Sequence, residues 1–330
     1  PLERKEKMIY DHIEFFNVEE INHKGNILRF KENIIQNLGN PAHTRGRFYG
    51  YRSIGAELRF VTESLFFDLK LRSDKEECKV YVFFGDYMFN SYTLKEGVVT
   101  NLHIEIPEKF LKYRESIKEY TYHPKLIRII IGYSGYVSYI GLNTYGNRRP
   151  PLESELPRKT LLLYGSSISH GSESLEYVNS YAFILSRLLK MDVLNKSIPG
   201  SCQAEEIMFN YLKEIPCDLA FAEFGVNVLG LYSLEEYQMH LDMLLNSFQA
   251  KEVYFTSILD NGNLLEPESL SYKQMQAFRE YARSIKKYNY ILPEELLDDF
   301  SSLTADFLHP SDYGQMRIAV NLYKKLNKSN

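Results

Sequence analysis

The sequence predicts an α/β protein in which an antiparallel β-sandwich precedes a three-layer α/β/α domain with a parallel sheet. Three observations lead to this prediction. The first 150 residues alternate apolar and polar side chains with a period of two, which is typical of half-buried strands. After residue 160, short apolar runs alternate with amphipathic helical stretches, which indicates a parallel sheet covered on both faces. A proline-rich stretch separates the two patterns.

The first half contains several short strands without long amphipathic helices between them. Alternation is clearest over residues 66–72 and 102–106, where every second side chain is apolar. This arrangement favours an antiparallel sandwich or jelly roll. Further strands are expected at residues 57–62, 79–84, 126–131 and 137–142, and a helix is expected at residues 109–120.

The second half follows a linker and alternates strands with helices. Residues 145–159, YGNRRPPLESELPRK, hold three prolines and little apolar periodicity. The expected division is therefore a β-sandwich accessory domain at residues 1–150, a linker at 151–159 and an α/β domain at 160–330. Strands are expected at residues 160–164, 192–196, 218–224 and 252–258, and helices at residues 176–189, 203–214, 234–247, 271–287 and 313–326.

Helix ends and faces can also be assigned. Ser233 and Glu236 form a capping box for the helix at 234–247. Either Ser311 or Asp312 can cap the last helix. Two methionines at helical spacing, Met239 and Met243, are expected in the core.

The bulk properties narrow the class of protein. At 330 residues, with 44% hydrophobic and 25% charged residues, the chain has the composition of a globular protein and the length of two domains. A net charge of −4 gives no electrostatic reason to expect nucleic acid or an anionic membrane surface as a partner. The three cysteines are too few and too scattered for a disulfide framework or a metal knuckle. We expect Cys78, Cys202 and Cys217 to be reduced packing residues.

The N-terminal residues PLERKEKMIYDHIEFF lack the apolar run of a secretory signal. No window approaches the roughly 20 apolar residues that span a bilayer. A cytoplasmic location is the resulting expectation. The chain begins with a proline, so a processed or trimmed N-terminus stays open.

Candidate site residues follow three of the expected strands. The segment YGSSISHG, residues 164–171, places Ser167 on a tight turn after a buried strand, where a serine is positioned for nucleophilic attack. Gly200 in IPGSC and Asn227 in GVN follow the next two strands along the chain. Because ligands gather at the carboxyl ends of parallel strands, we expect these residues to share one edge of the sheet.

The tetrad DFLH, Asp306 to His309, precedes the last helix and can fold over the same edge. The carboxylate would fix the tautomer of the imidazole, whose other nitrogen faces Ser167. The predicted catalytic residues are thus Ser167, Asp306 and His309. The predicted oxyanion hole consists of the backbone N–H groups of Ser167 and Gly200 and the side-chain amide of Asn227. Acyl transfer by this set requires no metal and no organic cofactor.

Simpler interpretations exist for each of these residues. Ser167 could be an ordinary turn residue, Asn227 a turn or capping residue, and the Asp306–His309 pair a surface ion pair. Of the eight histidines, however, His309 alone has an Asp three positions earlier.

Three other residues are weaker candidates. His170 is expected to line or border the cleft, because a base on the same tight loop could hardly reach the serine in line. Cys202 would need a neighbouring base or cation to become a nucleophile, and the sequence shows none, so packing is expected. His240 is expected at the surface or its boundary.

The four blocks, in this order, resemble the SGNH hydrolase superfamily, which includes the GDSL esterases and lipases. GSSISHG matches the first block with Ser167 as the nucleophile, although Ser166 stands where Asp is usual. Gly200 matches the second block and Gly225 with Asn227 the third, with Val228 in place of a frequent Asp. Asp306, His309 and Pro310 match the last block, and the resemblance covers residues 160–326.

The resemblance implies a serine esterase, and a β-sandwich before an SGNH domain is similar to the two-domain carbohydrate acetylesterases. The expected function is hydrolysis of short-chain acyl esters, above all acetyl esters, of a carbohydrate or small metabolite through an acyl-enzyme on Ser167. Two alternatives stay open: acyl transfer at the same site, and a non-catalytic protein that binds a glycan or partner. The expected partner is the small-molecule or carbohydrate ester, without nucleic acid or membrane; the oligomeric state is not predicted.

Overall fold

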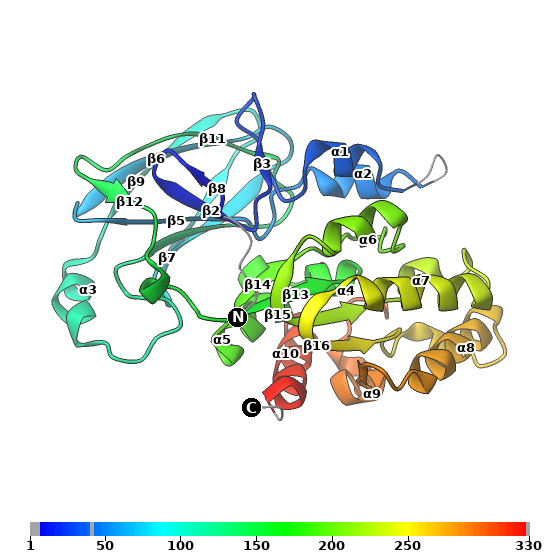
Figure 1. The fold of residues 1–330 in the computed structure, drawn as a ribbon. Coiled ribbons are helices and arrows are strands. Elements are labelled where there is room, and N and C mark those ends of the chain that lie inside the picture. Colours follow the sequence, from blue (N-terminus) through cyan, green and yellow to red (C-terminus); the bar gives the residue numbers. More distant parts are fainter. Residues whose placement is uncertain (1–6, 40–42, 328–330) are drawn as a thin grey trace. The chain divides into compact units, whose positions relative to one another are not determined.

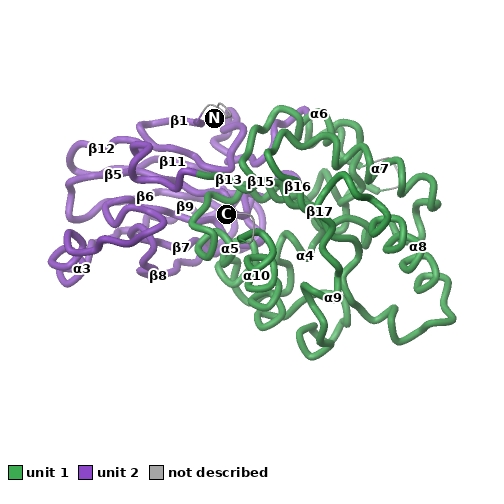
Figure 2. Tube along the Cα trace, turned by 60° about the horizontal axis from the view of Figure 1, so that its bottom comes forward, with its two compact units in different colours: residues 1–5, 34–49, 159–330 green, residues 6–33, 50–158 purple. Residues whose placement is uncertain are grey.

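The fold consists of two compact units, which are coloured separately in Figure 2. The computed structural model describes residues 7–39 and 43–327. Among these, unit 1 contains residues 34–39, 43–49 and 159–327, and unit 2 contains residues 7–33 and 50–158. Unit 1 therefore includes a short segment from the N-terminal half of the chain. The division at residues 150 and 160 stays a prediction.

Unit 2 is an antiparallel β-sandwich, as predicted. Within the described residues, one sheet has the strand order β1-β2-β5-β10-β7-β8 with β12 beside β5, a second has the order β11-β6-β9, and β3 pairs with β4. The strands are β1 Ile9–Tyr10, β2 Ile13–Phe16, β3 Glu20–Ile21, β4 Ile27–Leu28, β5 Glu57–Thr62, β6 Phe66–Ser73, β7 Cys78–Phe84, β8 Tyr87–Leu94, β9 Val99–Glu105, β10 Ile127–Ile131, β11 Val137–Asn143 and β12 Arg148–Arg149.

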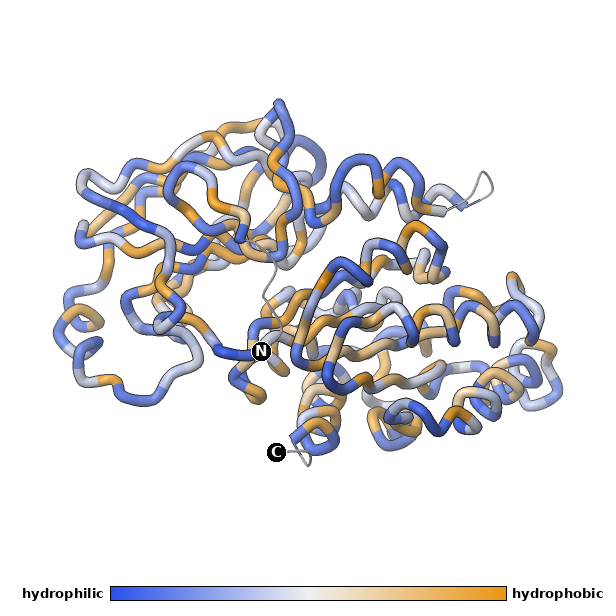
Figure 3. The backbone as a smooth tube through the Cα atoms, viewed as in Figure 1, coloured by the Kyte–Doolittle hydropathy of each residue, from blue (hydrophilic) through white to orange (hydrophobic). Residues whose placement is uncertain are grey.

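The core of unit 2 follows from the period-two alternation. On β6, Phe67, Leu69 and Leu71 are fully buried and belong to the same hydrophobic cluster as side chains of β5 and β10 in the other sheet. Phe67 meets Phe60 of β5 edge to face, with ring centroids 5.2 Å apart. Figure 3 shows hydrophobic residues interspersed with hydrophilic ones along these strands. The predicted helix at 109–120 is shorter: α3 is Glu108–Tyr113, followed by a 3-10 turn at Arg114–Ser116.

Unit 1 contains a sheet of parallel strands in the order β14-β13-β15-β16-β17, as far as the described residues show. Its strands are β13 Thr160–Tyr164, β14 Asp192–Asn195, β15 Pro216–Glu223, β16 Gln249–Thr256 and β17 Asn289–Tyr290. Each of the first four matches a predicted strand to within two residues, apart from β16, which begins three residues earlier. The interior strand β13 carries the fully buried run Leu161-Leu162-Leu163, because it pairs on both sides and is covered on both faces.

Helices cover both faces of this sheet, so the three-layer α/β/α architecture is confirmed (Figure 1). The chain moves from β13 to β14 in one direction and from β14 through β17 in the other. Right-handed crossovers therefore put α5 on one face and α6, α7 and α8 on the opposite face. The helices that follow the linker are α4 Ser167–His170, α5 Tyr181–Leu189, α6 Glu206–Leu212, α7 Leu234–Ser247, α8 Leu270–Ser284, α9 Pro293–Leu296 and α10 Asp312–Leu326.

Local signals set the ends of these helices. Ser233 and Glu236 form the predicted capping box of α7, and Ser311 rather than Asp312 caps α10 by accepting a hydrogen bond from the Gly314 amide. The expectation for Met239 and Met243 was wrong, since both are exposed. The buried stripe of α7 runs through Tyr237, Leu241 and Leu244 instead, and the methionines lie off that stripe.

Two short helices, α1 Glu32–Gln36 and α2 Arg45–Gly50, were not predicted. No helix among residues 7–39 and 43–327 is long and apolar enough to cross a membrane.

Candidate active site

The predicted nucleophile lies on a tight turn after β13. Ser166 caps α4 by accepting a hydrogen bond from the Ile168 amide at 3.1 Å, which makes Ser167 the first residue of that helix. Gly165 has no space for a larger residue, because a Cβ there would lie 2.3 Å from Ser169 Oγ. Ser167 itself is 8% exposed. The turn therefore holds the Ser167 hydroxyl in a fixed place that solvent still reaches.

The hydroxyl, the imidazole and the carboxylate predicted from the sequence form a continuous hydrogen-bonded chain. Ser167 Oγ lies 2.8 Å from His309 Nε2, and His309 Nδ1 lies 2.6 Å from Asp306 Oδ2. With Nδ1 protonated and donating to the carboxylate, Nε2 is left to accept the serine proton. Ser167 and His309 are 142 positions apart in sequence, so the fold is what brings them together.

Asp306 is held in place by its own loop. Its Oδ1 accepts hydrogen bonds from the Leu308 and His309 amides at 2.8 and 3.0 Å and from the Thr304 hydroxyl at 2.7 Å. Burial raises the pKa of Asp306, but the hydrogen bonds from the His309 ring and these donors outweigh burial and lower the pKa well below its ordinary value. The carboxylate is therefore ionised at neutral pH and can orient the imidazole.

The predicted oxyanion donors follow the neighbouring strands. Gly200 has a φ of 60°, in the left-handed region that favours glycine. Asn227 lies on a 3-10 turn after β15, and its Oδ1 accepts a hydrogen bond from the Cys202 amide at 3.0 Å. Because Oδ1 is occupied, the Nδ2 group of Asn227 is the end left to donate.

Hydrogen bonds link the loops that carry these residues. The Ile198 amide donates to the Gly165 carbonyl at 3.0 Å, and Asn195 Nδ2 donates to the Ser169 carbonyl at 2.9 Å. Since β14, β13 and β15 are parallel neighbours, their carboxyl ends meet at one edge. The structure thus places all five predicted site residues on loops around this edge; their catalytic roles stay predictions.

Glu223, at the end of β15, is a site residue that the sequence analysis missed. Its Oε2 accepts hydrogen bonds from the Ser166 amide at 2.9 Å, the Ser166 hydroxyl at 2.6 Å and the Ser169 hydroxyl at 3.1 Å. The side chain is buried, and its Oε1 has no hydrogen-bond partner within the described part of the chain. A carboxyl group thus stands directly behind the nucleophile turn, in contact with the serine that occupies the usual Asp position. A charged residue inside the apolar run LAFAEF is the signal that could have found it.

The surroundings of Glu223 raise its pKa to about 7. Burial is the main cause, and the hydrogen bonds from Ser166 and Ser169 offset it in part. Tyr181 supports this cluster, because its hydroxyl donates to Ser169 Oγ at 2.6 Å.

The weaker candidates lie outside the Ser167–His309–Asp306 chain. His170 is buried, with Nδ1 3.2 Å from Ser172 Oγ. Cys202 is buried, and burial raises the pKa of its thiol well above the ordinary value, which disfavours a thiolate nucleophile. His240 is half-buried, with Nδ1 2.8 Å from the Ala204 carbonyl oxygen.

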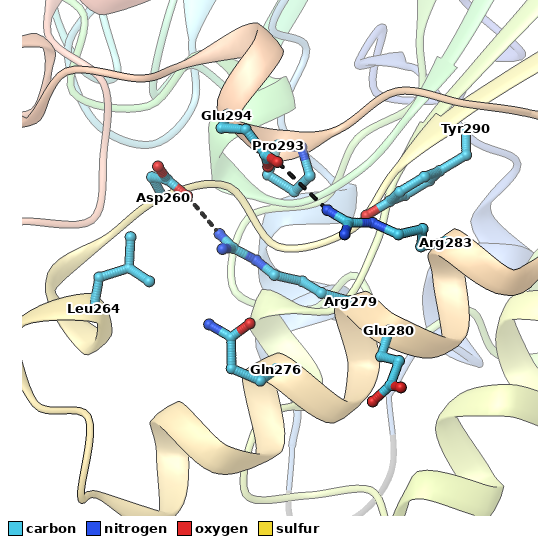
Figure 4. A pocket seen from close by; sticks show the side chains of 9 residues that line it. All are labelled: Asp260, Leu264, Gln276, Arg279, Glu280, Arg283, Tyr290, Pro293 and Glu294. Atoms are coloured by element: carbon cyan, nitrogen blue, oxygen red, sulfur yellow. Dashed lines mark hydrogen bonds and ion pairs between the residues drawn. The ribbon is translucent and has the colours of Figure 1, made fainter.

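Two cavities of unit 1 lie near the carboxyl ends of the outer strands. The cavity in Figure 4, of about 560 Å³, contains none of the predicted site residues. Its arginines are paired: Arg279 with Asp260 at 2.8 Å and Arg283 with Glu294 at 3.4 Å. A second hollow, of about 410 Å³, is lined by Asp306, Phe307 and Leu308 together with residues of the 261–266 turn. This hollow therefore borders Asp306, the carboxylate of the Ser167–His309–Asp306 hydrogen-bonded chain.

Within the described residues, no group of three or more His, Cys, Asp or Glu side chains is arranged to hold a metal ion.

A three-layer α/β/α domain with Ser167, His309 and Asp306 on the loops at one edge of its sheet is the arrangement that defines the SGNH class of acyl hydrolases and acyltransferases. A model of the GDSL-like lipase/acylhydrolase family matches residues 158–327, and the chain belongs to this family. It is therefore a hydrolase or an acyl-transferring enzyme. No curated protein matches the chain significantly.

Solved structures resemble the chain over most of its length. A salicylyl-acyltransferase, SsfX3, from a tetracycline biosynthetic pathway is 11% identical, with a TM-score of 0.78 over 98% of this chain and 96% of that one. A family two carbohydrate esterase from Cellvibrio japonicus is 15% identical, with a TM-score of 0.61 over 96% and 95%. An acetyl xylan esterase from Butyrivibrio proteoclasticus is 12% identical, with a TM-score of 0.54 over 83% and 90%. At these identities the similarity concerns the fold.

Proposed function

We propose that the chain is a serine esterase that hydrolyses short-chain acyl esters, above all acetyl esters, of a carbohydrate or small metabolite. The observation that carries this proposal is the unbroken chain from Ser167 Oγ through His309 to Asp306, with contacts of 2.8 and 2.6 Å. A hydroxyl so placed can lose its proton to Nε2 while it attacks an ester carbonyl.

The reaction proceeds in two halves. Ser167 Oγ bonds to the carbonyl carbon, His309 Nε2 takes the serine proton, and the carbonyl oxygen becomes an oxyanion. The N–H groups of Ser167 and Gly200 and the Asn227 amide donate to that oxyanion, each donor contributing about 10²–10³ in turnover. His309 then gives the proton to the leaving alcohol, and the acyl group stays on Ser167. Water, activated by the same imidazole, releases the acid and regenerates the hydroxyl.

The substrate class rests on the architecture and on the neighbours. Two of the similar structures are named as a carbohydrate esterase and an acetyl xylan esterase, and each matches this chain over most of its length. An acetylated sugar is therefore the first substrate to test.

Acyl transfer is the second candidate, and a specific observation favours it. The structure with the TM-score of 0.78 is named as an acyltransferase. The acyl-enzyme is common to both reactions, so the difference lies in whether water or an alcohol takes the acyl group.

An activity screen tests both candidates. The purified chain is incubated with para-nitrophenyl acetate, longer para-nitrophenyl esters and acetylated sugars, with and without alcohol acceptors. We expect release of acetate, faster for acetyl than for longer chains, and loss of release in Ser167→Ala. Ser284→Ala, which changes an exposed serine of α8, is the matched control and should retain wild-type rates. Acyl groups recovered mainly on the acceptor would establish transfer, and no turnover of any ester would overturn the proposal.

A further inference from the structure

The segment of residues 34–39 and 43–49 belongs to unit 1, although in sequence it lies between strands β4 and β5 of the β-sandwich (Figure 2). It is fixed to the loop that follows β14. The Gly39 amide donates to Glu205 Oε1 at 2.9 Å. Within the segment, Arg47 Nε donates to the Leu38 carbonyl at 3.0 Å. Gly46 packs so closely that a Cβ on it would lie 2.8 Å from Ser201 Oγ. The fold thus brings residues from the N-terminal half to the predicted oxyanion loop.

Arg45 is the residue that this segment delivers to Gly200. A Cβ built on Gly200 would lie 3.3 Å from both Cδ and Nη1 of Arg45, so the guanidinium end of the side chain runs beside the glycine. Gly200 is the residue whose N–H we propose as an oxyanion donor. A full positive charge therefore lies beside the proposed oxyanion donor.

Arg45 is exposed and has no hydrogen-bond or ion-pair partner among residues 7–39 and 43–327. Two other arginines of unit 1, in contrast, are paired: Arg279 with Asp260, and Arg317 with Asp298. A guanidinium presents a rigid fork of N–H donors that fits a carboxylate or phosphate in a bidentate manner. Without a carboxylate of its own, Arg45 keeps this fork available to a ligand.

We propose that Arg45 is a specificity-determining residue that binds an anionic group, a carboxylate or a phosphate, on the ester substrate. The inference rests on the proposed function and narrows it to esters that carry a negative charge close to the scissile carbonyl. The role of holding Arg45 against the oxyanion loop then explains why residues 34–39 and 43–49 belong to unit 1 and not to the β-sandwich.

The test compares anionic and neutral esters of matched shape. On the alcohol side, para-acetoxybenzoate and para-acetoxyphenyl phosphate are compared with neutral para-acetoxybenzamide. On the acyl side, para-nitrophenyl hemisuccinate is compared with its neutral methyl ester. We expect at least one anionic member to have a kcat/KM about 10-fold or more above its neutral partner, the size of a charge-assisted hydrogen bond. The preference should decrease with added salt, which screens an exposed charge.

Variants assign the preference to Arg45. Arg45→Gln should reduce the anionic-to-neutral ratio to about one, Arg45→Glu should invert it, and Arg45→Lys should restore part of it because it retains the charge without the fork. Arg187→Gln, which removes an exposed arginine of α5, is the matched control and should leave the ratio unchanged. Circular dichroism confirms that each variant is folded.

The outcomes separate this inference from the proposed function. Turnover of neutral and anionic esters at similar rates, or a preference that persists in Arg45→Gln, would overturn the role of Arg45 and leave the esterase proposal intact. No turnover of any member would refute the esterase proposal first. In that case, calorimetric titration of Ser167→Ala with para-acetoxybenzoate and para-acetoxybenzamide still decides the charge preference through binding alone.

Discussion

Each unit of the protein buries a glutamate on a strand, and the two carboxyl groups have opposite pKa shifts. In unit 2, Glu57 of β5 lies between two arginines: Arg128 contacts its oxygens at 2.7 and 3.0 Å, and Arg59 Nε contacts Oε2 at 2.8 Å. In unit 1, Glu223 of β15 accepts hydrogen bonds from Ser166 and Ser169, which carry no charge.

The partners decide the direction of the shift. Burial alone raises the pKa of Glu57, but the charges of Arg128 and Arg59 outweigh burial and lower the pKa to about 2. Burial likewise raises the pKa of Glu223; hydrogen bonds from hydroxyl and amide groups and the more weakly acting charge of His309 offset burial only in part, and the pKa is about 7. The two clusters therefore have different structural roles. The Glu57 cluster is a buried network of ion pairs within unit 2. The Glu223 cluster holds the nucleophile turn at the cost of a buried carboxyl group whose Oε1 has no hydrogen-bond partner among the residues that the structure describes.

The largest effect should come from the nucleophile itself. Ser167→Ala removes the hydroxyl and should lower kcat for acetyl ester hydrolysis by a factor on the order of 10⁶. The free energy of unfolding should change little, because neither carboxyl cluster loses a partner. Steady-state kinetics with para-nitrophenyl acetate and urea unfolding measure the two quantities. If Ser167→Ala retained turnover, the turn held by the Glu223 cluster would carry some other nucleophile.

Removing the charge of Asp306 should have the next largest effect. Asp306→Asn keeps the size of the side chain but removes the acceptor that sets the His309 tautomer, and kcat should fall by about 10⁴-fold. Asp299→Asn, at a partly exposed carboxylate elsewhere in unit 1, is the control. A loss in the control as large as the loss in Asp306→Asn would contradict a specific role for Asp306.

A stability effect without a catalytic effect is expected in unit 2. Glu57→Gln leaves Arg59 and Arg128 buried without their carboxylate, and the free energy of unfolding should fall by about 3–5 kcal/mol. The control variant Glu77→Gln, at an exposed glutamate of unit 2, should change the free energy of unfolding by less than about 0.5 kcal/mol. Specific activity per folded molecule should stay at the wild-type level. If Glu57→Gln instead lowers turnover of the folded enzyme, the separation between the two clusters is wrong.

Removal of the proposed oxyanion donor Asn227 should lower the rate of the reaction less than the changes at Ser167 and Asp306. Asn227→Ala removes the Nδ2 donor, and kcat should fall by about 10²–10³-fold with KM nearly constant. The same change also frees the Cys202 amide, so the melting temperature must be measured beside the kinetics. A rise in KM at constant kcat would indicate substrate binding rather than oxyanion stabilisation.

The smallest effect is a difference in pH dependence between the two clusters. The pKa of Glu223 is raised from 4.5 to about 7, so its contribution to stability is complete below pH 4.5 and is lost as the pH rises towards 7. The pKa of Glu57 is lowered to about 2, so its contribution is complete above pH 4.5 and is lost as the pH falls towards 2.

Chemical unfolding from pH 3 to pH 8 separates these contributions. As the pH rises through this range, the free energy of unfolding of the wild type should decrease relative to that of Glu223→Gln. As the pH falls, the free energy of unfolding of the wild type should decrease relative to that of Glu57→Gln. The same slope for both variants would contradict the comparison.

Much of the fold was predictable because it depends on short-range patterns. Alternating side chains on β6 and the buried run of β13 are visible in the sequence, and so are the caps of α7 and α10. Met239 and Met243 show the limit of this approach: helical spacing fixes a shared face but not which face meets the sheet. The short helices α1 and α2 have too few residues for periodicity to reveal them.

The site was predictable where a motif marks each residue after a strand. Ser167, His309 and Asp306 could be named because the hydroxyl follows a strand and the acid lies three positions before the base. For Glu223, the charge inside the apolar run LAFAEF was a signal, but its contacts with the nucleophile turn were not visible. Arg45 could not be named, because its role depends on contact with a loop more than a hundred residues away. Such contacts leave no spacing in the sequence.

The most direct test of the central claim is to trap the acyl-enzyme. The wild type is mixed with para-nitrophenyl acetate, quenched in acid within one turnover, digested and analysed by mass spectrometry. We predict one acetyl group on the peptide that carries Ser167, attached to that serine, and none in Ser167→Ala. Acetyl on another residue, or full turnover by an enzyme that lacks the Ser167 hydroxyl, would contradict the account.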